Sequence, residues 1–392
     1  MLENNMKKIT LVSDTINKDD VNAIIEWLKQ DPTPKLTKGD LTILLEKRWA
    51  EKVGTKHSIF VNSGSSAILL LLAALKETGK YSNKIVCPAL SWITDVSTPI
   101  LLGFDPILCD CNLEDLSCDL NELENIFKKN QSDKPMLFIS VSTLGIVPKI
   151  NELLCLCKKY NVELIEDNCE SMGSTYENKM LGSFGLASVY SMYFGHHIST
   201  IEGGFINTSD EELNTILLSM RSHGWNRDLS YEAKQSLKKE WNTSDFDELY
   251  CFYYPGLNLR STDLQAFIGL RAIEKLDFYS LMRNKNFFYY QKTIKNNELK
   301  IEKRENSFIS NLGYPVLNKN RNLIAKELQK NNIESRPLIA GSIANKPFWI
   351  KKYGRSSFTN ADKVDKFGLY LPNHHDLLEC DIETIANIIN KF

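Results

Sequence analysis

The sequence predicts an α/β protein built around a mostly parallel central sheet, and three observations lead to this fold class. Short apolar stretches alternate with amphipathic ones over roughly 200 residues, which is the pattern of strands and helices in a parallel sheet covered on both faces. The stretch 137–141 (LFISV) has the β-branched and aromatic content of a buried strand. Polar motifs follow several of these stretches, and sheets of this kind bind ligands at the carboxyl ends of their strands.

The expected elements follow the chain in order. Residues 14–53 are predicted to be mostly helical, with a break at the prolines of 31–34. Residues 230–248 are charged and lack a clear period, so a loop is expected there, and a long helix is expected from 262 towards 295. The expected strands are 57–62, 84–86, 107–109, 137–141, 163–166, 187–193 and 204–207, and further helices are expected at 65–75 and 150–160.

Two domains are expected, because 392 residues exceed what one compact core usually holds. Residues 1–275 are predicted to form a large domain that includes the N-terminal helical segment and all the polar motifs. Residues 276–392 are predicted to form a smaller C-terminal α+β domain.

Composition and charge narrow the function classes. Hydrophobic residues make up 43% of the chain and charged residues 24%, as in ordinary globular proteins. The formal charge of −2 gives no support for a nucleic-acid or membrane-surface partner. The longest apolar run, 67–75, is about half of a membrane span. Residues 1–8 lack the apolar core of a signal peptide, so a cytoplasmic location is expected.

The nine cysteines favour neither disulfides nor a metal site. An odd number in a large chain argues against a secreted disulfide framework. The close pairs, Cys109/Cys111 and Cys155/Cys157, have C-x-C spacing, and no Cys/His cluster has zinc spacing. Reduced and mostly buried thiols are therefore expected, with no metal.

Four motifs lie where a ligand would bind. In 61–67 (VNSGSSA) a Ser/Gly turn starts a helix, which fits either a phosphate cradle or a simply capped helix. Asp167 closes an apolar strand, where it could protonate the pyridine nitrogen of a pyridoxal cofactor or cap a turn. Segment 190–204 holds His196 and His197 after a strand and then Glu-Gly-Gly. Segment 256–265 (GLNLRSTDLQ) alone indicates only a helix start.

Together the four motifs resemble the DegT-type sugar aminotransferase family, whose members are pyridoxal 5′-phosphate enzymes of fold type I. The resemblance covers nearly the whole chain and implies a three-layer cofactor-binding large domain, over residues 1–275, in a homodimer with shared active sites. It implies cofactor contacts at Gly64 and Ser65 (phosphate), Trp92 (ring stacking), Asp167 (pyridine nitrogen), Glu170 (near the ring hydroxyl), Ser191 (phosphate) and Asn258 (phosphate, from the neighbouring subunit).

The chain departs from the family at its most important position. Typical members carry there the lysine that bonds covalently to the cofactor, whereas this sequence has His196, and no lysine lies between Val189 and Asn207. Imidazole cannot replace that bond, so the cofactor is expected to be held noncovalently and to work as pyridoxamine 5′-phosphate. A neutral His196 would serve as the general base.

A small branch of the family shares this histidine, and its members are 3-dehydratases of nucleotide-linked 4-keto-6-deoxy sugars. The chain is similar to them also at 222–225 (SHGW) and 333–341 (IESRPLIAG). The resemblance implies loss of the C3 hydroxyl of such a sugar, most simply a GDP-linked one, on the way to the 3,6-dideoxy sugars of surface polysaccharides. His223, Arg336 and Glu202 are the expected substrate residues.

One type in this branch, from the ascarylose pathway, carries a four-cysteine iron–sulfur cluster, which is not expected here. Residues 229–250 contain no cysteine, and Cys251 stands alone. The other type, from the colitose pathway, has no cluster and uses L-glutamate to regenerate the cofactor amine. An arginine of the branch pattern is missing from 340–347 (AGSIANKP), so the resemblance does not decide between a hexose and a heptose as the sugar of the substrate. The nucleotide of the substrate, GDP or CDP, also stays open.

Three other interpretations remain open. A sugar aminotransferase would share nearly every site residue, with His196 as the feature against it. A non-catalytic binding protein of the same fold would be expected to have lost several site residues together. A metal protein would use His196/His197 with His374/His375.

Overall fold

A seven-stranded sheet forms the centre of the computed structural model, which describes residues 8–392. The strand order is β1-β9-β8-β5-β4-β2-β3, and β9 runs antiparallel to both neighbours while the other adjacent strands are parallel. The prediction of a mostly parallel sheet is therefore confirmed. The strands are β1 (His57–Val61), β2 (Lys84–Pro88), β3 (Asp105–Cys109), β4 (Met136–Val141), β5 (Val162–Asp167), β8 (Ala187–Ser191) and β9 (Gly204–Thr208).

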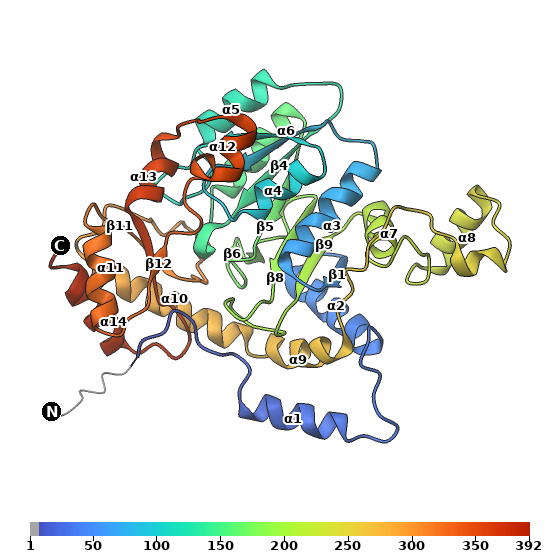
Figure 1. The fold of residues 1–392 in the computed structure, drawn as a ribbon, viewed down its shortest axis with the longest axis horizontal. Coiled ribbons are helices and arrows are strands. Elements are labelled where there is room, and N and C mark those ends of the chain that lie inside the picture. Colours follow the sequence, from blue (N-terminus) through green and yellow to red (C-terminus); the bar gives the residue numbers. More distant parts are fainter. Residues whose placement is uncertain (1–7) are drawn as a thin grey trace.

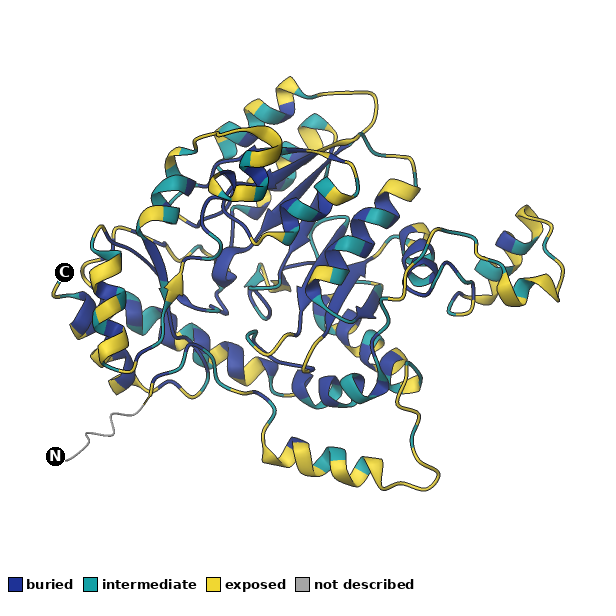
Figure 2. Ribbon diagram, viewed as in Figure 1, coloured by how far each residue is buried: buried dark blue, intermediate teal, exposed yellow. Residues whose placement is uncertain are grey.

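Helices cover both faces of this sheet, which makes three layers (Figure 1). Successive strand residues point to opposite faces. Ile139 thus belongs to the apolar cluster that contains α3 and α7, whereas its neighbour Phe138 packs with α5 and α6. The strands are buried almost throughout (Figure 2). The helices of this part are α1 (Lys18–Leu28), α2 (Asp40–Val53), α3 (Gly64–Glu77), α4 (Thr94–Leu101), α5 (Leu120–Lys129), α6 (Ile150–Tyr160), α7 (Glu211–Met220), α8 (Tyr231–Glu240) and α9 (Asp263–Ile273).

The C-terminal part contains a second, antiparallel sheet of order β11-β13-β12, as expected of an α+β unit. The N-terminal segment lies beside it, because Ile9 exchanges backbone hydrogen bonds of 3.0 Å with Asn332 and Glu334. The division at 275/276 stays a prediction. The elements are α10 (Leu276–Thr293), β11 (Tyr314–Leu317), α11 (Arg321–Lys330), β12 (Arg336–Pro337), α12 (Pro347–Tyr353), α13 (Thr359–Phe367), β13 (Gly368–Leu371) and α14 (Glu379–Ile389), and the small strands β6 (Thr175–Tyr176), β7 (Lys179–Met180) and β10 (Ser307–Phe308) form a third sheet.

Two expected elements were wrong. Residues 230–248 are not a loop: Ser230 caps α8 by accepting a 3.2 Å hydrogen bond from the N–H of Ala233, and α8 projects at the right of Figure 1. Only Leu237 of this helix is buried, so it has no apolar stripe for a sequence pattern to reveal. The long helix expected from 262 to 295 is two helices, α9 and α10, which are separated by Glu274 and Lys275.

Two general expectations can be compared with the structure. All nine cysteines are free thiols and five of them are buried, as expected. Within residues 8–392, every helix is either too short or too polar to cross a membrane.

Candidate active site

A pocket of about 500 Å³ opens at the carboxyl ends of the central strands. It lies where the N-terminal ends of α3 and α4 meet the carboxyl ends of β5 and β8. Two segments that are distant in sequence complete it: Leu11 and Val12 from the N-terminus, and Glu334, Arg336 and Tyr370 from the C-terminal part.

The structure brings most of the predicted site residues together in this pocket. Parallel strands present their carboxyl ends at one edge of a sheet, so motifs that are separate in sequence converge there. The predicted residues that line the pocket are Gly64, Ser65, Trp92, Asp167, Glu170, Ser191, His196 and Arg336.

The start of α3 has the shape of a phosphate cradle. Ser63 caps the helix by accepting a 3.0 Å hydrogen bond from the N–H of Ser66, which leaves the first backbone N–H groups directed at the pocket. A Cβ on Gly64 would lie 2.6 Å from Cβ of Ser191, and one on Gly204 would lie 2.4 Å from the carbonyl of Ser63. Both glycines are therefore needed for the close approach of this turn to β8 and β9.

Two acidic residues line the pocket at the carboxyl end of β5: Asp167 is the last residue of the strand, and Glu170 follows it. Oδ1 of Asp167 accepts a 2.8 Å hydrogen bond from the N–H of Cys169, and Oε2 of Glu170 accepts one of 2.7 Å from the N–H of Leu144. Burial raises the pKa of Glu170 to about 7; the hydrogen bond from Leu144 opposes this shift and the charge of Asp167 adds to it. Glu170 is thus a group that exchanges its proton near neutral pH.

His196 forms part of the pocket wall as a neutral base. Burial lowers the pKa of its imidazole to about 4, the positive charge of Arg283 acts in the same direction, and a hydrogen bond with the backbone of Cys169 acts against them. Its Nδ1 has no hydrogen-bond partner within residues 8–392. His197, whose role the sequence left open, is fully buried and lies 2.8 Å through Nε2 from the carbonyl of Ser310. His197 packs behind the pocket and does not line it.

Trp92 gives the pocket a flat apolar wall. Its side chain is 54% exposed, and it lies at the start of α4 opposite the strand ends. An exposed aromatic face at this position is suited to stacking on a planar ring.

Three predicted residues lie outside the pocket of their own chain. Glu202 is exposed, and its backbone carbonyl accepts the hydrogen bond from Nε2 of Gln265 at 2.5 Å. The ring of His223 packs 5.0 Å from that of Trp225. Asn258 is exposed, and its Oδ1 accepts a 3.0 Å hydrogen bond from Nε of Arg260.

The structure also adds residues that sequence reasoning missed. Tyr193, Phe194, Gly195 and Glu334 lie within segments already singled out, Val141 ends a predicted strand and Cys169 lies two residues after Asp167, so these places in the sequence were the available signal. The remaining residues carried no local signal, because they reach the pocket from a helix turn or from distant segments: Leu11, Val12, Thr94, Asp95, Leu312 and Tyr370.

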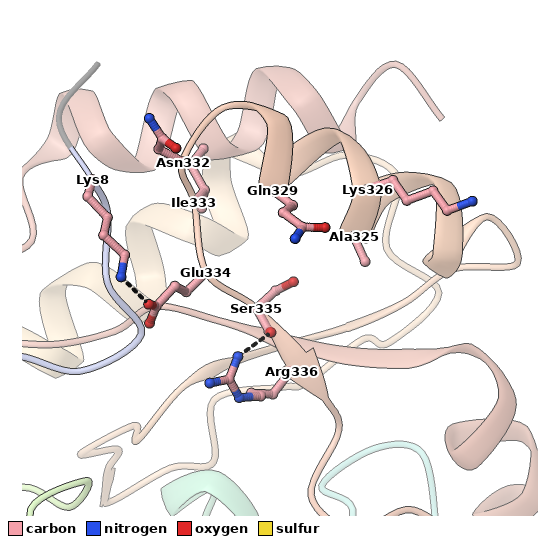
Figure 3. A pocket seen from close by; sticks show the side chains of 9 residues that line it. All are labelled: Lys8, Ala325, Lys326, Gln329, Asn332, Ile333, Glu334, Ser335 and Arg336. Atoms are coloured by element: carbon pink, nitrogen blue, oxygen red, sulfur yellow. Dashed lines mark hydrogen bonds and ion pairs between the residues drawn. The ribbon is translucent and has the colours of Figure 1, made fainter. Parts of the chain in front are cut away.

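A second pocket, of about 440 Å³, adjoins the first between the N-terminal segment and α11 (Figure 3). Glu334 and Arg336 line both pockets. Lys8 forms a 2.7 Å ion pair with Glu334, and Nη1 of Arg336 donates a 3.3 Å hydrogen bond to the carbonyl of Ser335 (Figure 3). Arg336 thus lines both pockets, and the contact of its guanidinium in Figure 3 is with a backbone carbonyl and not with a carboxylate.

The histidines give no sign of a metal centre. No group of three or more His, Cys, Asp or Glu side chains suited to a metal occurs in the part of the chain that the structure describes. His374 lies 3.2 Å from the carbonyl of Thr10, and His375 stacks on Tyr279 with ring centroids 3.8 Å apart. Packing contacts account for this second pair.

These features define a class of protein. A three-layer fold with a mostly parallel sheet, a glycine-dependent anion cradle, a buried aspartate and an aromatic wall at the strand ends is that of a pyridoxal-phosphate enzyme of fold type I. The chain belongs to the DegT/DnrJ/EryC1/StrS aminotransferase family, whose model matches residues 14–390.

Two curated relatives have the same name, GDP-4-keto-6-deoxy-D-mannose 3-dehydratase. The relative from Escherichia coli O55:H7 is 32% identical, over 90% of this chain and 92% of that protein. The relative from Yersinia pseudotuberculosis is 30% identical, over 98% and 99%. A solved structure of the E. coli enzyme with bound hydrated PLP has a TM-score of 0.86 at 30% identity, covering 98% of this chain and 99% of that chain.

Proposed function

We propose that this protein is a pyridoxamine-phosphate-dependent 3-dehydratase of a nucleotide-linked 4-keto-6-deoxy sugar, with a GDP-linked sugar as the first candidate. One observation carries the proposal: His196 lines the pocket at the position where aminotransferases of the family have their lysine, and no lysine is among the described residues that line it. The dehydratase names of the two relatives support the same reaction.

The pocket residues fit the cofactor. The α3 start, with Gly64, Ser65 and Ser191, is suited to the phosphate, Trp92 to one ring face and Asp167 to the pyridine nitrogen. When bound, the cofactor supplies an amine for the C4 ketone of the sugar and a conjugated ring that accepts electrons. One solved relative holds a PLP–glutamate adduct, which supports L-glutamate as the amine donor that restores the working form.

His196 moves the proton in this proposal. At neutral pH its lowered pKa leaves a ring nitrogen unprotonated, and this nitrogen would accept the proton that C4′ of the cofactor loses. The imidazolium that results can return this proton to the C3 hydroxyl, which then leaves as water. A lysine would instead bond to the cofactor or return a proton to C4 of the sugar and give transamination.

Three residues outside the pocket support a homodimer with shared sites. Glu202, His223 and Asn258 do not line the pocket of their own chain, so the roles that the family resemblance implies for them require a pocket of a second subunit. A second copy would bring Asn258 to the phosphate and place His223 and Glu202 near the sugar. We expect no nucleic-acid or membrane partner, in line with the near-neutral charge, and a cytoplasmic location, in line with the polar residues 1–8.

The decisive experiment gives the purified protein GDP-4-keto-6-deoxymannose, pyridoxal phosphate and L-glutamate, and follows the products by mass spectrometry and NMR. Loss of the C3 hydroxyl together with formation of 2-oxoglutarate is the expected result. A stable amino sugar would instead establish an aminotransferase, the activity named for a relative from Helicobacter pylori that is 26% identical. No turnover of GDP- or CDP-linked sugars, with no binding of the cofactor, would overturn the proposal in favour of a non-catalytic protein.

A further inference from the structure

Asp95 is a buried carboxyl group that the proposed reaction does not use. It lies in the first turn of α4, three residues after Trp92, and borders the floor of the pocket with no exposed surface. Oδ2 accepts a hydrogen bond from Oγ of Ser91. Oδ1 receives no donor from any residue that the structure describes.

The other group in contact with Asp95 is a second carboxyl, that of Asp167. The two side chains line the same pocket, and Asp167 is both a hydrogen-bond partner and a neighbouring charge among the causes that raise the pKa of Asp95. Two ionised carboxylates cannot form that bond, since both are acceptors only. The contact therefore requires one proton, and the more deeply buried partner, Asp95, is the one that loses most by being charged.

The charges around Asp95 also favour its neutral form. The groups that act on it are Asp167 and Glu170, both acidic, while Cys87 and Cys169 lie close enough for Asp95 to raise the pKa of each thiol. Burial, followed by the charge of Asp167, raises the pKa of Asp95 well above its usual value of 3.8. The start of α4 favours an anion, but a helix end is a weaker influence than a carboxylate in direct contact.

We propose that Asp95 is a neutral carboxylic acid that donates a hydrogen bond to Asp167, and that it is a positioning residue for the group that holds the cofactor's pyridine nitrogen. This inference rests on the proposed function for the role of Asp167. Oδ1 of Asp167 is already fixed by the N–H of Cys169. A second donor on the remaining oxygen locks the rotamer of this carboxylate, which keeps it in place for the cofactor's pyridine nitrogen.

Two substitutions separate the neutral acid from an ionised one. Asp95→Asn keeps a neutral donor of the same shape, whereas Asp95→Leu keeps the volume and removes the donor. In the full-length protein without added cofactor, the infrared difference between wild type and Asp95→Asn at pH 7 should contain the C=O band of a protonated carboxylic acid. This measurement tests the pair even if the protein proves not to be a dehydratase.

Cofactor binding provides the second readout. Asp95→Asn should bind pyridoxal phosphate within about threefold of wild type and keep its absorption spectrum, whereas Asp95→Leu should bind at least about tenfold more weakly, with a shifted pH titration of the bound cofactor's absorbance. If the acid band is missing and Asp95→Asn binds as weakly as the leucine variant, Asp95 is ionised and the inference is wrong.

A stability measurement keeps the test decisive if the leucine variant does not fold. The pKa of Asp95 is higher in the folded than in the unfolded chain, so the folded state holds the extra proton and wild type loses stability as pH rises above about 4. Asp95→Asn has no such loss. Its advantage in denaturant midpoint over wild type should grow from pH 5 to pH 8, and a constant difference would contradict the inference.

Discussion

The pocket has two walls of opposite character. We call the carboxyl groups of Asp95, Asp167 and Glu170 the carboxylate wall and His196 the histidine wall; His197 and Arg283 act on His196 without lining the pocket. Burial raises the pKa of the acids Asp95 and Glu170 and lowers that of both histidines. Both groups of side chains are therefore shifted towards their neutral forms, and at pH 7 the pocket contains a free imidazole together with acids that retain or share protons. That arrangement suits proton transfer without a covalent lysine.

The largest expected effect comes from removing the base of the histidine wall. His196→Asn should keep pyridoxal phosphate binding, because the cradle at Gly64 and Ser65 is untouched, and should lower the dehydration rate by about 10²- to 10⁴-fold, the usual share of a general acid–base group. Product formation by NMR and cofactor absorbance after gel filtration are the two readouts. Turnover within a few-fold of wild type would remove His196 from the mechanism.

A control variant tests whether the loss of activity is specific to His196. His375→Asn changes a histidine that stacks on Tyr279 outside the pocket and should leave the rate unchanged.

Asn258→Ala tests the shared site. A mixture of inactive His196→Asn and Asn258→Ala subunits should regain activity after exchange, because a hybrid dimer contains one intact site. A mixture that stays inactive would place Asn258 in the site of its own chain.

The sequence predicts residues of each wall, Asp167 and His196 among them, but not the buried residues that act on them, Asp95 and Arg283. His196, Asp167 and the Ser-Gly turn follow strands, and strand ends can be located from apolar patterns, so their convergence was predictable. Asp95 follows no strand, and Arg283 lies in the middle of α10, where it is merely one cation among many. Their effects depend on burial and on contacts between segments far apart in sequence, which local patterns do not contain. The same is true of Tyr370 in the pocket.

The buried cation that acts on His196 should have the next largest effect. Arg283 is 1% exposed, and its Nη1 donates to the carbonyl of Leu312 at 3.1 Å and also to those of Asn311 and Asn373. Arg283→Met removes this donor from all three carbonyls, of which that of Asn311 keeps the donor Nδ2 of Asn373, and should destabilise the protein by about 2–4 kcal/mol. Chemical denaturation measures this loss.

The same substitution should change the pH dependence of the reaction. The charge of Arg283 lowers the pKa of His196, so its removal should move the acidic limb of the kcat/KM profile to higher pH by about half to one unit. Arg283→Lys is the matched control, since it keeps the charge with fewer donors and should leave the limb in place. Identical profiles for Met and Lys would show that Arg283 acts only through packing.

Replacing Glu170 on the carboxylate wall should change the stability of the protein less than replacing Arg283, and the change should be a gain that grows as pH rises. Its pKa rises from 4.5 in the unfolded chain to about 7 in the folded one, so the folded state holds the extra proton between these values and wild type loses stability as pH rises through this window. Glu170→Gln does not titrate, and it should become the more stable protein above pH 7, by about 1–3 kcal/mol. The N–H of Leu144 can still donate to the amide oxygen, so the contact itself is kept. Denaturant midpoints of the cofactor-free protein at pH 5 and pH 8 measure the difference, and a gap that does not widen between these two values would mean that Glu170 is ionised in the folded state.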